Sequence, residues 1–588
     1  MGLDPLNLDS LDSLREIPGV GEKIAGRMED FFGSEEGALG RIREGDVASL
    51  STVPGLTEAK ASRIVRSAIA EEYRAVDLLQ TEVVERICEE VLKKIRRGAQ
   101  TAYGEAKLSI YFPIGSKERI SNVQDWVRKA LNTEVGDGTD EMLEGVSPLS
   151  PPNRTRIGDR AVVTSDPEKI EEARKAFPEV AVELVENRRE LRGVAANHER
   201  VILIDEAIPW SSDASERLDH KPGAVDDPVE IVPERVLSFF AENAEAVRNA
   251  INVWKSIDAP PSGLFEGIDD GRIDEVEGLL SRLDPTGGVK GNEGVKRVGR
   301  ALNELDGSIA DAEARINEEI ESVFGEREIR VEGTHILDLV KQKGEAKDLI
   351  RSELESEFDR AVDEAVGNLV SDLELDFEEK DLACDLFPRE PELPVERNEQ
   401  VADRLKKRLR RKYSRKSLNA KTELAKELRG YEEDVRKLVE GVLELDVALA
   451  VKRFAEEHGM TLPEFGEKGF KIRGGRNLLL EDPEPIDYRA EEATLLTGVN
   501  SGGKTTTLDL VAQVYVLARM GFPVPAEEAV VEPVDRIYYY RPSKNTMNSG
   551  AFEGALRKFE NVLELDGSKL VLADELENIT EPGASARI

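Results

Sequence analysis

The chain has 588 residues, of which 119 are Asp or Glu and 81 are Lys or Arg, so its formal net charge is −38. At about 100 to 200 residues per domain this length predicts several domains, and the 39% apolar content is that of a globular protein. No apolar run approaches the roughly 18 residues of a membrane span, and the N-terminus lacks the features of a signal peptide, so we expect a soluble, cytoplasmic protein with no membrane partner.

Two further global features limit the possible partners. Cys88 and Cys384 lie far apart without metal-ligand spacing, which predicts neither a disulfide framework nor a structural metal. A strongly acidic chain repels polyanions at long range, so binding of nucleic acid would have to come from local features. The acidity is equally compatible with a solvated surface in a salt-rich cytoplasm, where repulsion is screened.

Residues 1–72 contain two similar units, each with a Pro-Gly turn between an apolar approach and a helical pattern. The units resemble tandem helix-hairpin-helix modules, in which N–H groups at a helix start approach a DNA phosphate. In the second unit Thr57 stands where the second hairpin glycine is expected. A purely structural Pro-Gly turn is the alternative. The resemblance implies DNA contacts at Gly19, Gly21, Lys23, Gly55 and Lys60.

The next segments change from helical to mixed patterns. Residues 73–104 predict a connecting helix that ends in a basic cluster and a glycine. Residues 105–235 alternate apolar runs with helical stretches, which predicts a small α/β domain. Its strands are expected at 161–164, 180–185 and 201–204. Asp205 and Glu206 follow the last of these, but no phosphate loop precedes them, so we interpret this acidic pair as accidental.

Helical periodicity and high charge dominate the middle of the chain. They predict a helical core over 236–343, a coiled-coil clamp arm over 344–440, and a return lever and strand over 441–480. From 404 to 416 the arm has nine basic residues and no acid. This window is either a phosphate-contacting surface or a solvated helix face opposite acidic residues such as 353–364. On the first interpretation its DNA contacts are Arg404, Lys407, Arg408, Arg410 and Arg411.

The most specific motif lies at 494–505, where a short apolar run leads into GxxxxGKT and a helical pattern. In such a loop the glycines let main-chain N–H groups hold phosphates, the lysine neutralises the β- and γ-phosphates, and the threonine hydroxyl binds Mg²⁺. The motif therefore predicts ATP and Mg²⁺ as cofactors. The predicted nucleotide contacts are Gly498, Val499, Asn500, Ser501, Gly502, Gly503, Lys504, Thr505 and Thr506.

A second motif completes the predicted catalytic site. The apolar residues 570–573 predict a strand that places Asp574 at a sheet edge, where it would hold Mg²⁺ together with Thr505. Glu575 follows and is placed to polarise the attacking water. The predicted catalytic residues are therefore Glu575 and Lys504.

With these motifs the C-terminal part of the chain resembles the MutS family of DNA-repair ATPases, within the ABC class. The resemblance rests on 498–505, 521–527, 533–537 and 572–576 and covers about 300–588. It implies a P-loop α/β ATPase domain of ABC type over 481–588 and a homodimer formed through these domains. A Ser-rich signature segment of one subunit would close over the nucleotide of the other. The matching positions here are Ser549, Gly550 and Phe552, with glycine where the family has serine.

Two departures from the family pattern narrow the interpretation. No mismatch-reading domain is visible at the N-terminus, so the chain is more similar to the paralogue branch that lacks it. Members of that branch bind branched DNA or associate with ribosomes. The chain also ends at Ile588, before the strand and histidine switch that the family pattern leads us to expect. Either the natural protein is longer, or the ATPase domain is C-terminally incomplete and its turnover is impaired.

We therefore predict a multidomain α and α/β protein that combines a helix-hairpin-helix domain, a small α/β domain, a long helical clamp and an ATPase domain. Its predicted function is that of an ATP-dependent DNA clamp in repair or recombination, acting on branched or duplex DNA without mismatch reading. The alternatives are a ribosome- or structured-RNA-associated ATPase, and a structural clamp that binds ATP with impaired hydrolysis.

Overall fold

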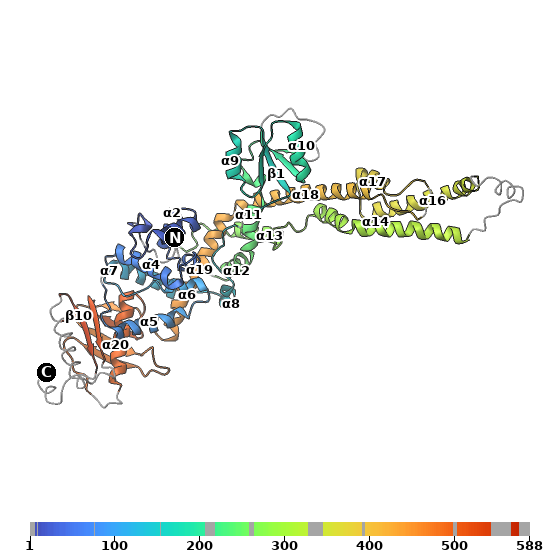
Figure 1. Ribbon diagram of the computed structural model, residues 1–588. Coiled ribbons are helices and arrows are strands. Elements are labelled where there is room, and N and C mark those ends of the chain that lie inside the picture. The colour runs from blue at the N-terminus through green and yellow to red at the C-terminus, as the bar shows by residue number, and fades with distance from the viewer. Residues whose placement is uncertain are drawn as a thin grey trace, which may run out of the picture. The chain divides into compact units, whose positions relative to one another are not determined.

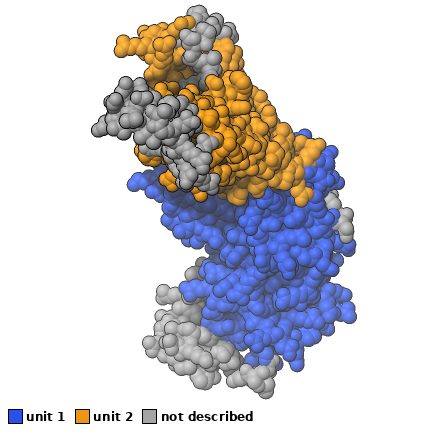
Figure 2. All heavy atoms as spheres, turned by 90° about the vertical axis from the view of Figure 1, so that its right-hand side faces the viewer, with its two compact units in different colours: residues 1–149, 243–274, 432–588 blue, residues 150–242, 275–431 orange. Residues whose placement is uncertain are grey.

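The computed structural model describes residues 6, 8, 10–75, 77–152, 155–205, 218–257, 264–326, 345–390, 394–497, 503–541, 562 and 566–574, without the side chains of 323–326 and 345–354. Figure 1 labels the helices and strands, and Figure 2 colours the two compact units that the chain forms. Unit 1 comprises 1–149, 243–274 and 432–588, and unit 2 comprises 150–242 and 275–431. Among the described residues, no helix has the length and apolar character that a bilayer crossing requires.

Unit 1 begins with short helices packed around a small apolar core. They are η1 (Leu14–Glu16), α1 (Glu22–Phe32), α2 (Glu35–Arg43), α3 (Val47–Ser51) and α4 (Glu58–Glu72). The two Pro-Gly turns precede α1 and α4, and in both the glycine has a left-handed backbone, with φ of +94° at Gly19 and +88° at Gly55. Only glycine adopts this conformation without steric cost, which explains its use at both turns. Leu14, Met28 and Leu50 are buried beneath them.

A second helical layer of unit 1 is built around one long buried helix, α19 (Glu432–Glu457), with α12 (Ala244–Lys255) and the start of α13 (Asp270–Ser281). Against α19 pack α5 (Glu82–Arg96), α6 (Ala102–Leu108), α7 (Lys117–Leu131) and α8 (Thr139–Glu144). Asp446 of α19 is fully buried and accepts hydrogen bonds from the N–H groups of Gln100 and Thr101. Lys107 and Glu444 form a buried ion pair in the same interface. Replacing one member would leave the other charge buried without a partner, which typically lowers the free energy of unfolding by about 3–5 kcal/mol.

In the described residues of its C-terminal part, unit 1 contains two sheets and one long helix. One sheet has the order β5-β8-β6-β7 and the other pairs β10 with β9 in parallel. The strands are β5 (Glu464–Phe465), β6 (Phe470–Gly475), β7 (Ile486–Ala490), β8 (Glu528–Val531), β9 (Arg536–Tyr540) and β10 (Lys569–Ala573). Helix α20 (Lys504–Met520) is buried from Leu510 onward and packs on α5 and α7.

Unit 2 contains a four-stranded, fully parallel sheet of order β2-β1-β3-β4. Its elements are β1 (Arg160–Thr164), α9 (Lys169–Ala176), β2 (Ala181–Leu184), α10 (Arg188–Asn197), β3 (Arg200–Leu203), β4 (Leu218–His220), η2 (Pro228–Glu230) and α11 (Glu234–Glu242). Neighbouring residues of β1 point to opposite faces, so Val162 packs with Phe177 after α9, and Val163 packs with Leu191 of α10. Helices therefore cover both faces, as parallel sheets require.

Unit 2 also contains an arm of helices, α14 (Glu293–Glu326), α16 (Glu345–Asp372), α17 (Phe377–Ala383) and α18 (Glu399–Arg429). α14 lies alongside both α16 and α18 (Figure 1). Their buried residues recur at helical spacing and form one core, for example Leu305, Ile309 and Ile316 of α14 with Leu405 and Leu409 of α18.

The structure differs from the sequence-based expectations in three places. Residues 105–149, expected at the start of the α/β domain, lie in unit 1, because α7 and α8 bury their apolar faces against α19. α14, expected in the helical core, shares its apolar core with α16 and α18 of the arm. Residues 494–497, expected as the strand before the phosphate loop, have no regular secondary structure, and Leu495 is 80% exposed.

Candidate nucleotide and nucleic-acid sites

The two predicted magnesium ligands, Thr505 and Asp574, meet at the start of α20, beside Lys504. Gly503 has a left-handed backbone, with φ +74°, and precedes Lys504 and Thr505 in the first turn of the helix. The parallel strand β10 ends immediately before Asp574, which is 5% exposed. The Thr505 hydroxyl donates to the carboxylate of Asp574, with an Oγ1–Oδ2 distance of 2.6 Å. Two residues that are far apart in sequence are thus in direct contact.

The donor set fits a nucleotide phosphate with a divalent cation. Oxygen ligands from one carboxylate and one hydroxyl are what Mg²⁺ takes from a protein when substrate phosphates supply the rest. The positive end of the α20 dipole lies in the same turn as Lys504, and both favour an anionic ligand. In the part of the chain that the structure describes, no group of three or more His, Cys, Asp or Glu side chains could hold a metal by itself.

Arg541, Asp509 and Tyr539 also belong to this site, although neither motif contains them. Arg541 follows β9 as Asp574 follows β10, and its Nη2 donates to Asp509 of α20 over 2.9 Å. The Tyr539 hydroxyl donates to the same Asp509 oxygen, also over 2.9 Å. Burial, with the neighbouring Asp509 charge, raises the pKa of Tyr539, so the phenol remains a hydrogen-bond donor.

A buried amide pair anchors the first turns of α20 from behind. The side-chain amide of Asn477, just after β6, donates to the carbonyl of Thr506 over 3.0 Å, and Gln513 donates to the Asn477 side-chain oxygen over 2.7 Å. Asn477 and Gln513 are 4% and 0% exposed. This pair fixes the position of Thr506, one of the predicted nucleotide contacts, and has no counterpart in the sequence motifs.

Several predicted site residues fall outside the described residues. They are Gly498, Val499, Asn500, Ser501 and Gly502 of the phosphate loop, Ser549, Gly550 and Phe552 of the signature segment, and Glu575.

The first hairpin of the tandem has an open helix start. Gly21 is the N-cap of α1 and no side chain caps this end. The space where a Cβ atom would stand at Gly19 or Gly21 is empty to 4 Å, and Lys23 is exposed beside it. The first N–H groups of α1 are therefore available to an anion.

The second hairpin is occupied by the protein itself. The Arg27 guanidinium donates to the carbonyl of Pro54 and fills the space beside Gly55. The Thr57 hydroxyl accepts the Lys60 N–H and thereby caps α4. The two turns share the left-handed glycine but differ in their capacity to receive a phosphate.

The basic window on α18 is partly neutralised within unit 2. Lys406 pairs with Asp306, Arg408 with Glu378, Arg410 with Glu199, and Lys412 with Asp376 and Glu379. These acids lie outside the 353–364 segment that the sequence suggested. Arg404 and Lys407 are exposed, and no ion pair is recorded for either within the described residues. The positive charge available to a partner is thus smaller than the sequence count implies.

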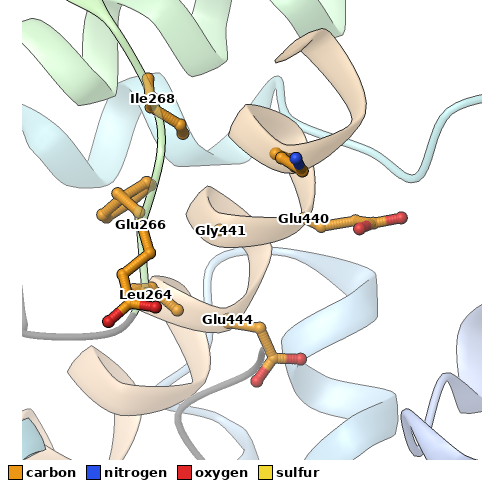
Figure 3. A pocket seen from close by; sticks show the side chains of 8 residues that line it. Leu264, Glu266, Ile268, Glu440, Gly441 and Glu444 are labelled. Carbon is orange, nitrogen blue, oxygen red and sulfur yellow. The ribbon is translucent and has the colours of Figure 1, made fainter. Parts of the chain in front are cut away.

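A cavity of about 110 Å³ in unit 1 is lined by Leu264–Glu266, Ile268 and one face of α19 (Figure 3). Of its acidic residues, Glu444 is already engaged by Lys107 and the Tyr103 hydroxyl. None of the predicted nucleotide contacts lines this cavity.

Comparisons with known proteins agree with the sequence-based predictions for the N-terminal tandem and for the C-terminal domain. Residues 494–582 match the family model of MutS domain V, and residues 11–69 match that of the SAM-like helix-hairpin-helix tandem. The chain is 26% identical over 521 residues to the DNA-binding protein MutS2 of Pyrococcus furiosus, covering 85% of this chain and 82% of that protein.

Two shorter matches lie within the same group of proteins. The chain is 35% identical over 152 residues to the DNA mismatch repair protein MutS of Thermus thermophilus, covering 24% of this chain and 18% of that protein. It is 33% identical over 174 residues to the endonuclease MutS2 of Halothermothrix orenii, covering 28% and 22%. The resemblance predicted from the motifs is confirmed. The chain thus carries a helix-hairpin-helix tandem and a MutS domain V, and it is similar over most of its length to the DNA-binding protein MutS2.

Proposed function

We propose that this protein is an ATP-dependent DNA clamp of the MutS type that acts in DNA repair or recombination on branched or duplex DNA, without mismatch reading. The observation that carries the ATP-binding part is the hydrogen bond between Thr505 and the buried carboxylate of Asp574. It supports a site in which a helix start, a lysine and two oxygen ligands converge on one small volume.

Each residue has a defined task at this site. Lys504 neutralises the β- and γ-phosphates of ATP, while the first N–H groups of α20 hold a phosphate by hydrogen bonds. Thr505 and Asp574 would hold Mg²⁺, which would supply charge neutralisation at the phosphates. Glu575 takes the proton of the attacking water. The phosphate loop 498–502 and a signature segment around Ser549, Gly550 and Phe552 of a second subunit would complete the site in a cytoplasmic homodimer.

The DNA partner is supported by three observations. The Pyrococcus relative is named a DNA-binding protein, and it is similar to this chain over most of the length of both proteins. The open helix start at Gly21 offers backbone donors for a phosphate that require no particular base. Arg404 and Lys407 on α18 add exposed positive charge for further backbone contacts.

The test measures binding of a fluorescent ATP analogue with Mg²⁺ to the full chain, and then ATP hydrolysis. Lys504→Ala should weaken binding of the analogue at least 10-fold, while Lys471→Ala, on the exposed surface of β6, should leave it unchanged. Full affinity in the Lys504→Ala chain would overturn the nucleotide site. Binding without any hydrolysis would instead favour a structural clamp.

The nucleic-acid partner is tested by gel shifts at fixed salt with a four-way DNA junction, a DNA duplex and a structured RNA. We expect the junction or the duplex to bind most tightly. A clear preference for the RNA would overturn the DNA assignment in favour of an RNA-associated ATPase.

A further inference from the structure

The guanidinium of Arg541 lies next to the carboxylate that is proposed to hold magnesium, but it does not form a hydrogen bond with it. Its Nε is 3.6 Å from Asp574 Oδ2, beyond hydrogen-bond distance, and Oδ2 is the oxygen that accepts the Thr505 hydroxyl. This Nε is buried and has no hydrogen-bond partner among the described residues. Among the described residues, Arg541 is thus a cation already within ion-pair distance of Asp574 and could bond it in place of a metal.

Two side chains hold Arg541 in this position. Its Nη2 donates to Asp509 Oδ1 over 2.9 Å and contacts the Tyr539 hydroxyl over 3.1 Å, and its guanidinium carbon lies 5.3 Å from the centre of the Tyr539 ring. Asp509 lies four residues after Thr505 on α20, so both project from the same side of the helix. Asp509 therefore holds the guanidinium through Nη2, while Nε remains in a longer ion pair with Asp574 at 3.6 Å.

We propose that Asp509 is a positioning residue that keeps Arg541 from closing its 3.6 Å ion pair with Asp574 into a direct hydrogen bond, and so leaves the Asp574 carboxylate available for Thr505 and for the cation of the nucleotide. Without the Asp509 charge, Arg541 would move from this ion-pair distance into a direct hydrogen bond with Asp574 and would compete with Mg²⁺ for the carboxylate. Arg541 would then act as an internal competitor, and its removal would relieve the effect. The inference rests on the proposed binding of ATP and magnesium.

The experiment titrates MgCl₂ into the full chain with a fluorescent ATP analogue at fixed concentration. Asp509→Asn should raise the Mg²⁺ concentration for half-maximal binding about 10-fold. The double variant Asp509→Asn with Arg541→Gln should return it to within about threefold of the unaltered chain. Tyr539→Phe, which removes the other group that holds Arg541, should act in the same direction as Asp509→Asn but more weakly. In EDTA the Asp509→Asn chain should bind the analogue at least as tightly as the unaltered chain.

Controls separate this role from a loss of packing. Glu528→Gln removes an exposed acid of β8 that pairs with Arg473 and should leave the titration unchanged. Rescue in the double variant is the outcome that a structural role alone would not give, because two losses in one packed cluster would add. An unshifted Asp509→Asn titration, or a double variant no better than the single one, would overturn the inference alone. A chain that binds no analogue under any condition would overturn the proposed function, and the inference with it.

Discussion

Thr81 and Tyr539 are joined by a hydrogen bond of 3.0 Å, in which the backbone N–H of Tyr539 donates to the Thr81 hydroxyl oxygen. Thr81 is the N-cap residue of α5, but its side chain does not cap that helix. The residues before it extend the pairing, because Ile537 donates its N–H to the carbonyl of Leu78 and Gln80 donates to the carbonyl of Ile537. The segment that follows the N-terminal tandem is therefore attached to the free edge of β9, the strand that leads to Arg541.

Loss of the Thr81 hydroxyl should loosen this attachment. Thr81→Val keeps the shape of the side chain but leaves the N–H of fully buried Tyr539 without an acceptor, at a cost of about 1–3 kcal/mol. Local opening of β9 should become easier by that amount, so amide exchange at Tyr539 should be about 5- to 150-fold faster. Hydrogen exchange of a peptide that spans β9 measures it. Thr81→Ser keeps the acceptor and should exchange like the unaltered chain, and equal rates in all three proteins would contradict the prediction.

Local sequence patterns were sufficient for three of the four described strands of unit 2 and for the glycine turns, but they did not predict β4 (Leu218–His220). Short apolar runs, one of them interrupted by Glu183, lie at β1, β2 and β3, where the sequence predicts strands. Gly19 and Gly55 stand where the backbone φ is positive, a requirement that the Pro-Gly pattern indicates directly. Both features depend on neighbours in sequence.

Long-range packing could not be predicted in the same way. The α6–α8 segment belongs with α19 because Asp446 accepts from Gln100 and Thr101, and because Lys107 pairs with Glu444. Each partner is an ordinary residue in its own segment. A sequence indicates that a charged residue is buried only when the residue belongs to a known motif, and these residues belong to none.

In the candidate site too, the residues within motifs were predicted and those brought in by long-range packing were not. The motifs identified Thr505 and Asp574, and the structure brings them into contact. They did not identify Arg541 or Asp509, although one signal was available. Arg541 follows an apolar strand as Asp574 does, and in the parallel pair Tyr540 lies opposite Ala573, so the next residues emerge at the same sheet edge.

The two hairpins of the tandem should differ in their contribution to DNA binding. Gly21→Asp places a carboxylate at the uncapped start of α1, where the backbone is extended and the space is empty. The new side chain should cap the helix and stabilise it by a few tenths of a kcal/mol to about 1 kcal/mol, while excluding phosphate from the same N–H groups. DNA affinity should therefore fall about 10-fold with unchanged or higher thermal stability.

Thr57→Asp is the matched control, because the start of α4 is already capped by the Thr57 side chain and Arg27 fills the adjacent turn. DNA affinity should change less than about threefold in this variant. Fluorescence anisotropy with a labelled duplex measures both. Equal losses in the two variants would mean that both hairpins bind phosphate, and no loss in either would mean that the tandem does not bind DNA through its helix starts.

On α18 we expect the contacts with DNA to come from Arg404 and Lys407, neither of which forms an ion pair with another described residue. The double variant Arg404→Glu with Lys407→Glu reverses two exposed charges and leaves the recorded pairs of Arg408, Arg410 and Lys412 intact. If these two residues contact phosphates, affinity should fall and the slope of log K against log salt should become shallower by about 2.

The control for this prediction reverses Arg174 and Lys175, two exposed basic residues of α9 in the same unit. It changes the net charge of the chain by the same amount, so it separates a local contact from a general electrostatic effect. A salt slope that both variants reduce equally would contradict a contact at Arg404 and Lys407. If neither variant changed the salt slope, the basic window would be a solvated helix face that does not contact DNA.

Cys88 gives a test of the α5 interface through pH. Burial raises the pKa of this thiol from about 9 to about 12. Between these values the folded chain keeps the proton that the unfolded chain has lost, so the contribution of Cys88 to stability is complete below pH 9 and is lost as the pH rises toward 12. The loss amounts to about 1.4 kcal/mol per pH unit. In a Cys384→Ser background, the midpoint temperature of thermal unfolding should thus fall more steeply above pH 9 in the protein with Cys88 than in the Cys88→Ala variant. Parallel curves for the two proteins would show that the Cys88 thiol ionises freely and that α5 does not bury it.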